Sequence, residues 1–126
     1  MNQEIWTAVD SYYEGLMVRS NPRFNKIIES SNEAGLPPIR ITSSLGKFLE
    51  LLVRFQGARR VLEIGTLGGY STAWLAQGLP PGGKLITLEI NPEHAAVARK
   101  NLSQFEFFHL VDIQVGDALD LSLIHI

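Results

Sequence analysis

The stretch from Val61 to Ser71, Val-Leu-Glu-Ile-Gly-Thr-Leu-Gly-Gly-Tyr-Ser, constrains the fold of this chain more than any other. Residues 61–64 form a short apolar run with one carboxylate, which is typical of a strand buried on both faces. The glycines that follow allow the backbone to turn sharply and to approach a ligand where a Cβ would collide. A helical run starts at Tyr70, and we expect Ser71 or Thr72 to cap it. This order of strand, glycine turn and helix predicts an α/β fold that binds a nucleotide-like ligand beyond the carboxyl end of the strand.

A second carboxylate supports this interpretation. Glu89 ends the next predicted strand, at a spacing from Gly65 that suits a carboxylate accepting hydrogen bonds from ribose hydroxyls. Together the two features predict a cofactor that contains a nucleoside.

Composition narrows the class of protein. The chain has 126 residues, enough for one domain but few for a complete doubly wound sheet, and its 45% hydrophobic and 19% charged residues indicate a globular protein. A net charge of −2 gives no general attraction to nucleic acid. The absence of cysteine excludes disulfides and thiolate metal sites, and fits a reducing cytoplasm. The sequence contains no signal peptide and no apolar run long enough to span a bilayer, so we expect a cytoplasmic protein with no membrane partner.

Residues 1–58 are expected to form an N-terminal unit of three helices. Hydrophobic periodicity predicts a helix over 3–19, a second from Pro22 to about Gly35, and a third from about 43 to Gly57. The first two are expected to serve as a lid or a dimer contact, with plain core cover as the alternative, and the third is expected to cover the sheet. The apolar residues expected on one side of the third helix are Leu45, Phe48, Leu49, Leu52 and Val53.

Residues 59–120 are expected to form the cofactor-binding half of a parallel sheet. Strands are predicted at 60–64, 84–88 and 111–115, with helices between them, and the second of these helices should begin at Pro92 with Asn91 as its cap. The sheet is then incomplete, because the apolar first strand has a partner on only one side. Its free edge is a predicted site of aggregation or strand swapping.

The last six residues, Leu121-Ser-Leu-Ile-His-Ile126, break the pattern of the sequence. They match what a transposon mosaic-end adapter, used in preparing sequencing libraries, encodes when it is read in frame. We therefore expect residues 121–126 to be a non-native tail, with a genuine short apolar terminus as the alternative, and we assign no function to His125.

With these motifs in view, the chain resembles the cation-dependent O-methyltransferases of the catechol and caffeoyl-coenzyme A type, which use S-adenosylmethionine (SAM). The likeness runs from about residue 35 to 119 and is carried by Val61–Thr72, Leu79-Pro-Pro-Gly-Gly83 and Leu88-Glu-Ile-Asn-Pro92. It implies the N-terminal half of a Rossmann-like methyltransferase fold, with helices followed by a parallel β-α-β-α-β unit. Relatives often carry an aromatic or larger residue around positions 67 and 68, where this chain has Leu67-Gly68.

The resemblance implies four residues at the methionine end of the cofactor. Ile41 and Thr42 would lie over this end, Glu63 would lie near the amino group directly or through water, and Ser71 would bind the carboxylate at a helix start. From the residues alone, Glu63 could instead be neutral or paired with a buried cation, and Ser71 could be only a helix cap.

The resemblance also implies residues along the adenosyl part. Gly65 and Thr66 would pass their backbone beside the cofactor, Glu89 would bind both ribose hydroxyls, and Asp117 and Ala118 would border the adenine. From the residues alone, Glu89 could instead be exposed at a strand end, and Asp117 could be a turn former.

The remaining candidate residues have simpler predicted roles. Tyr70 and Trp74 are expected in the core rather than as stacking platforms, and His94 and His109 are expected to be structural or solvated. No cluster of metal ligands is visible in the sequence.

In the resembling family a divalent cation, usually magnesium, lowers the pKa of the acceptor hydroxyl. Carboxylates and an Asn hold that ion, and a Lys assists deprotonation. These groups would lie on later strands, so we assign no catalytic or metal-ligating residue here and expect the chain alone to be inactive. The full-length protein is expected to be a homodimer acting on a small hydroxylated molecule. A catechol, a coenzyme A thioester and a modified tRNA base all stay open as acceptors.

The residues by themselves are also compatible with two other functions. An NAD(P)-binding oxidoreductase domain would also use a glycine turn and an acidic strand end, but it would require Gly-x-Gly-x-x-Gly, and position 67 is Leu. A non-catalytic cofactor-binding module is the other alternative.

Overall fold

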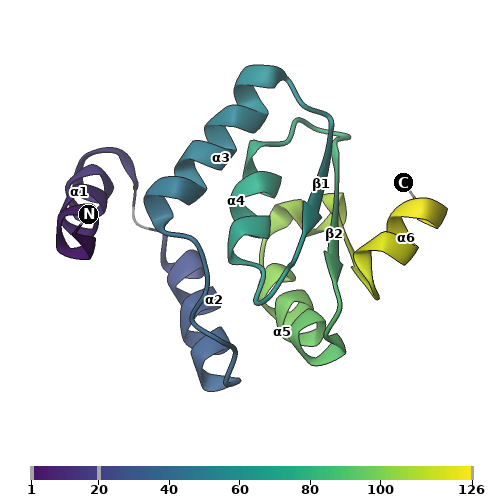
Figure 1. The fold of residues 1–126 in the computed structure, drawn as a ribbon. Helices are drawn as coiled ribbons and strands as arrows, with labels where there is room; N and C mark the ends of the chain where they lie inside the picture. The colour runs from purple at the N-terminus through teal and green to yellow at the C-terminus, as the bar shows by residue number, and fades with distance from the viewer. Residues whose placement is uncertain (1, 20, 126) are drawn as a thin grey trace.

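The computed structural model describes residues 2–19 and 21–125 (Figure 1). Residues 1 and 20 lie outside the described residues, as does Ile126, the last residue of the predicted non-native tail. The elements in chain order are α1 (Gln3–Met17), α2 (Pro22–Glu33), α3 (Ser43–Gln56), β1 (Arg60–Ile64), α4 (Tyr70–Gly78), β2 (Lys84–Glu89), α5 (Pro92–Leu102), the 3₁₀ helix η1 (Glu106–Leu110), β3 (Val111–Val115) and α6 (Ala118–His125).

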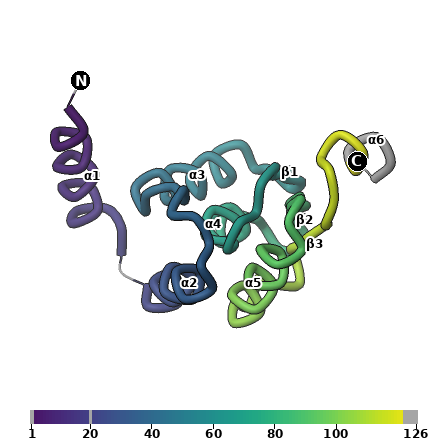
Figure 2. Tube along the Cα trace, turned by 60° about the horizontal axis from the view of Figure 1, so that its bottom comes forward, coloured from purple at the N-terminus to yellow at the C-terminus, as the bar shows by residue number. Residues whose placement is uncertain are grey.

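The three strands form one parallel sheet in the order β1-β2-β3. Helices α4 and α5, which connect successive strands, lie on the same face of this sheet, and α6 lies on the opposite side (Figures 1 and 2). This arrangement confirms the predicted parallel β-α-β-α-β unit with an incomplete sheet. Because β1 and β2 are adjacent and run parallel, their carboxyl ends lie side by side at the same edge of the sheet.

Side-chain caps begin α2, α3 and α5 where the sequence predicts these helices to start. Asn21 and Asn91 each accept hydrogen bonds from backbone N–H groups of the following helix, and a proline follows each as the first helical residue. Thr42 caps α3 in the same way, and Gly57 ends that helix in the left-handed conformation. Because these signals act within a few residues, the tertiary structure does not alter them.

The predicted cap of α4 is wrong. The capping residue is Gly69, with a φ of +88°, and no side chain caps the helix. The hydroxyls of Ser71 and Thr72 donate to Glu63 instead. Ser71 and Thr72 lie within the first turn, after the capping position, and their hydroxyls make charge-assisted hydrogen bonds to the carboxylate on β1.

The core lies where α2, α4 and α5 meet. Phe24 contacts the rings of Trp74, Tyr70 and Phe105, at centroid separations of 4.3, 6.0 and 5.4 Å. Tyr70 and Trp74 are both buried, which confirms their predicted place in the core. Helix α2 covers this core with its buried residues Phe24 and Ile27.

The apolar side of α3 is only partly buried. Val53 is buried but Leu45, Phe48 and Leu52 are exposed, and the face that packs on α4 is completed by Gly46 and Glu50. A Cβ at Gly46 would overlap the indole of Trp74, so the small residue is what allows the two helices to approach.

Strand β1 is not buried on both faces as the sequence predicts. Leu62 is 44% exposed and Ile64 is 70% exposed, whereas Val61 and Glu63, on the helix-covered face, are half-buried. The reason is that β1 is an edge strand, since among the described residues only β2 pairs with it.

Helix α1 extends away from the rest of the chain (Figures 1 and 2) and has no buried residue. Two hydrogen bonds connect it to α3. Ser43 Oγ donates to Glu14 Oε1 at 2.6 Å, and Ser44 Oγ donates to the Asp10 carbonyl at 3.3 Å. None of the helices in the described part of the chain combines the length and the apolarity needed to cross a membrane.

Candidate functional site

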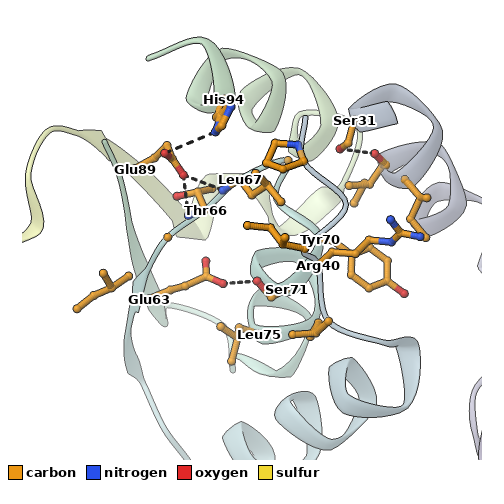
Figure 3. Close-up of a pocket in the computed structure, with 18 of the residues that line it drawn as sticks. Ser31, Arg40, Glu63, Thr66, Leu67, Tyr70, Ser71, Leu75, Glu89 and His94 are labelled. Carbon is orange, nitrogen blue, oxygen red and sulfur yellow. Dashed lines mark hydrogen bonds and ion pairs between the residues drawn. The ribbon is translucent and has the colours of Figure 1, made fainter. Parts of the chain in front are cut away.

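A cavity of about 640 Å³ opens at the carboxyl end of β1. The turn after β1, the first turn of α4, helix α2 and the segment before α3 form its walls (Figure 3). Six of the nine residues predicted to bind the cofactor line this cavity. They are Ile41, Glu63, Gly65, Thr66, Ser71 and Glu89.

The other three predicted residues do not line it. The Thr42 hydroxyl accepts from the Leu45 backbone N–H at 3.3 Å, and Asp117 Oδ1 accepts from the Leu119 N–H at 2.8 Å. Asp117 therefore acts here as the turn former that the sequence left open, immediately before Ala118 begins α6. The proposed contacts of these three residues with a cofactor stay predictions.

The turn between β1 and α4 has the left-handed backbone that its glycines favour. Gly65 and Gly69 have φ values of +92° and +88°, and Leu67 has a φ of +51°, the one positive value at a non-glycine residue in the described ranges. A Cβ at Gly68 would overlap the hydroxyl of Ser31 on α2. A larger residue at position 68 would require the Ser31 side chain to move.

Glu89 holds the turn from the end of β2. Its Oε2 accepts hydrogen bonds from the backbone N–H groups of Thr66 and Leu67 at 3.1 and 2.8 Å (Figure 3). Its Oε1 accepts from the Asn91 N–H at 2.9 Å and lies 3.8 Å from Nδ1 of His94. Only 7% of Glu89 is exposed, so these bonds replace the water that a buried carboxylate loses.

Glu63 lies on β1 and accepts three hydroxyl hydrogen bonds. Ser71 Oγ donates to its Oε1 at 2.5 Å, and Thr72 Oγ1 and Thr87 Oγ1 donate to its Oε2 at 2.6 and 2.7 Å. Burial raises the pKa of Glu63 above its ordinary value, and the three hydroxyls oppose that shift without cancelling it. No cation pairs with this carboxylate among the ion pairs of the described residues, so it is suited to receive a positively charged ligand group.

Sequence reasoning missed three residues at this site. Thr72 and Thr87 hold Glu63, and His94 lines the cavity beside Glu89 rather than being only structural or solvated. One signal was available for Thr87, because side chains alternate along a strand and Thr87 therefore shares the face of Glu89. The contact with Glu63 depends on the pairing of β1 with β2, in which Glu63 lies opposite Thr87.

A divalent cation is usually held by several carboxylate or imidazole side chains. The described residues contain no group of three or more histidine, aspartate or glutamate side chains close enough to hold a metal ion.

Comparison with known protein families identifies the chain. Residues 16–123 match the family model described as O-methyltransferase. The chain belongs to the O-methyltransferase family. The fold of this family member is accordingly the Rossmann-like fold of SAM-dependent methyltransferases, of which the described residues form the first three strands and the helices around them.

Curated relatives of this O-methyltransferase family member are also O-methyltransferases. The chain is 43% identical over 121 residues to a catechol O-methyltransferase from Niastella koreensis, covering 96% of the chain and 55% of that protein. It is 46% identical over 112 residues to a catechol O-methyltransferase from Mycobacterium tuberculosis, covering 89% of the chain and 51% of that protein. The chain thus spans about half the length of the curated relatives it matches.

Solved structures give the same family. An O-methyltransferase from Bacillus cereus in complex with S-adenosylhomocysteine (SAH) is 44% identical with a TM-score of 0.92, over 96% of this chain and 56% of that one. The O-methyltransferase TomG from Streptomyces achromogenes, in complex with SAM, is 43% identical with a TM-score of 0.88, over 96% and 54% of the two chains.

Proposed function

We propose that this chain is the cofactor-binding half of a SAM-dependent O-methyltransferase whose acceptor is a hydroxyl of a small aromatic molecule, catechol-like or linked to coenzyme A. The observation that carries the proposal is the meeting of two carboxylates at one cavity. Glu63 from β1 and Glu89 from β2 both line it, on either side of the glycine turn. The names of the curated relatives support the choice of acceptor class.

The charge of the site suits the methionine end of SAM, which carries an ammonium and a sulfonium. We propose that Glu63 receives the ammonium, because its carboxylate lines the cavity and is bonded to neutral hydroxyls rather than to a cation. We assign the cofactor carboxylate to the backbone N–H of Ser71 and its neighbours in the first turn of α4, because the Ser71 hydroxyl already donates to Glu63 and the helix dipole favours an anion there.

The ribose end is assigned to Glu89. Its backbone hydrogen bonds to the turn fix the orientation of the carboxylate, and a carboxyl oxygen can accept more than one donor. His94 is proposed as a further neighbour of this end, because it lines the cavity at the same carboxylate.

The cofactor, when bound, supplies an activated methyl group on a positively charged sulfur. The residues of this chain bind and orient that cofactor, which contributes to catalysis by fixing one of the two reacting molecules. The groups that position the acceptor and remove its proton are proposed to lie in the part of the full-length protein that this chain does not span. We therefore propose that the chain alone has no methyltransferase activity.

Calorimetry tests the cofactor assignment. We expect saturable binding of SAH and none of NAD, and at least about tenfold weaker SAH binding for Glu63→Gln and for Glu89→Gln, because each loses a charge-assisted hydrogen bond. Glu93→Gln is the matched control, since Glu93 is exposed in the first turn of α5 and does not line the cavity. Preferential binding of NAD, or equal effects of all three variants, would contradict the proposal.

A turnover assay tests the proposal that the chain alone has no methyltransferase activity. The chain is incubated with SAM, magnesium and a catechol, and the methylated product is measured. We expect none, and product formation above the level of a protein-free control would show that the chain is a complete enzyme.

A further inference from the structure

Thr87 lies at the centre of β2 and has no exposed surface. It pairs in register with Glu63 on β1, and its hydroxyl oxygen is 2.7 Å from Glu63 Oε2. The same oxygen is 2.7 Å from the hydroxyl oxygen of Thr66, which is also buried, in the turn after β1. Thr87 therefore contacts both a carboxylate of the site and the turn beside it.

The number of hydrogen atoms fixes the direction of these bonds. A threonine hydroxyl has one proton to donate, and the carboxylate of Glu63 can only accept. Thr87 thus donates to Glu63 and accepts from Thr66, which gives a directed chain from Thr66 through Thr87 to Glu63.

This series of hydrogen bonds continues to the second carboxylate, Glu89, through the backbone of the turn. The N–H of Thr66 donates to Glu89 Oε2, and the N–H of Leu67 donates to the same oxygen. One buried hydroxyl, at Thr87, therefore lies between the group proposed for the amino end of the cofactor and the turn held by the group proposed for its ribose end.

We infer that Thr87 is a positioning residue that couples the two ends of the cofactor site, by holding the Glu63 carboxylate and the Thr66 side of the turn at the same time. The inference rests on the proposed function, because it assigns the two ends to one cofactor. Loss of this hydroxyl leaves the Thr66 hydroxyl without its acceptor and Glu63 with one donor fewer, so both ends of the site lose a constraint.

Thr72 offers a matched comparison. It is equally buried and donates to the same oxygen of Glu63, at 2.6 Å, but it does so from α4. Its hydroxyl supports the amino end of the site without passing through Thr66. Removal of the Thr72 hydroxyl is therefore expected to affect one end of the cofactor only.

The test measures binding of two probes by calorimetry. SAH contains both ends of the cofactor, and adenosine contains only the nucleoside. We expect Thr87→Val, which keeps the shape but removes the hydroxyl, to weaken binding of both probes about tenfold. Thr72→Val should weaken SAH but leave adenosine unchanged, and Thr87→Ser, which keeps the hydroxyl, should bind both probes like the wild type.

A second measurement does not depend on any cofactor. Amide hydrogen exchange at Thr66 and Leu67 reports how firmly the turn is held. We expect exchange at both amides to accelerate in Thr87→Val and to stay at the wild-type rate in Thr72→Val. If Thr87→Val does not fold, Thr66→Val removes the other half of the same hydrogen bond and is expected to change exchange at Leu67 and adenosine binding in the same way.

The outcomes separate this inference from the proposed function. Failure of the wild type to bind SAH would contradict the proposed function, and the exchange rates would still decide the role of Thr87. Unchanged adenosine binding together with unchanged exchange in Thr87→Val would overturn the inference, and so would equal effects of the Thr72 and Thr87 variants on adenosine.

Discussion

Two glutamates removed from water have opposite pKa shifts because their partners differ. Burial raises the pKa of Glu63, whose hydrogen-bond donors are neutral hydroxyls. Burial also acts to raise the pKa of Glu50, but hydrogen bonds from Lys47, Gln77 and Arg54 outweigh it and the pKa falls below its ordinary value. The cations on α3 thus make Glu50 a structural anion, whereas no ion pair of the described residues includes Glu63.

Glu63→Gln is predicted to increase the stability of the free protein while weakening SAH binding. Because the folded-state pKa of Glu63 is raised, its contribution to stability is complete below the unfolded pKa of about 4.3 and is lost as pH rises through the folded value. The variant should therefore exceed the wild type in free energy of unfolding at pH 7 and lose this advantage at pH 4. Urea denaturation at the two pH values measures this, and a variant less stable at pH 7 would contradict it.

Gly46→Ala is predicted to destabilise the fold although alanine is the better helix former. The added methyl would overlap the Trp74 indole, and overpacking of this kind typically costs about 1–3 kcal/mol. Gly15→Ala on α1 is the control, because a Cβ there meets nothing within 4 Å, and it should be neutral or stabilising by up to about 1 kcal/mol. Thermal unfolding of both variants checks the difference, and equal behaviour would show that α3 does not approach α4 as described.

At the scale of elements, a charge cluster joins α3 to α4. Glu50 on α3 accepts from Lys47 Nζ and Arg54 Nε of its own helix and from Gln77 Nε2 of α4, each at 3.0 Å. Arg54 also donates to the backbone carbonyl of Gln77 at 3.2 Å. The cluster satisfies a buried carboxylate and fixes how the two helices lie against each other.

Glu50→Gln is predicted to cost about 1–3 kcal/mol of stability at pH 7, because hydrogen bonds to a charged group are lost. The lowered folded-state pKa of Glu50 means that its contribution is present above the unfolded pKa of about 4.3 and disappears as pH falls through the folded value. The difference between variant and wild type should therefore shrink in acid. Denaturant unfolding from pH 7 down to pH 2 measures it, and a constant difference would exclude an electrostatic origin.

At the scale of the whole molecule, two apolar surfaces are left without cover in the described part of the chain. One is the outer side of β1 with Leu62 and Ile64, and the other is the face of α1 with Val9, Tyr12 and Leu16. An exposed strand edge pairs readily with another chain, because its backbone hydrogen-bonding groups are free.

We predict that the chain self-associates through β1 as its concentration rises. Leu62→Lys should reduce association, measured by sedimentation velocity, because a charge on an edge strand opposes pairing. Val9→Lys is the comparison on α1 and should leave association unchanged. The reverse result would contradict the role of β1 and support α1 as the predicted dimer contact.

The sequence by itself determined the order of the α-helices and strands from α1 to β3, the cap at Asn91, and the meeting of Gly65 and Glu89 at neighbouring strand ends. These features follow from signals within a few residues and from the connections of a parallel sheet. The nine cofactor-binding residues were implied by the family resemblance, and six of them line one cavity.

Only the tertiary structure decided which face of α3 is buried, where the hydroxyls of Ser71 and Thr72 donate, and that the Thr87 hydroxyl contacts both Glu63 and Thr66. Each of these depends on how closely two elements approach across the fold. Such a distance is set by the packing of residues far apart in sequence, such as Gly46 against Trp74, and hydrophobic periodicity along one helix or strand carries no information about it.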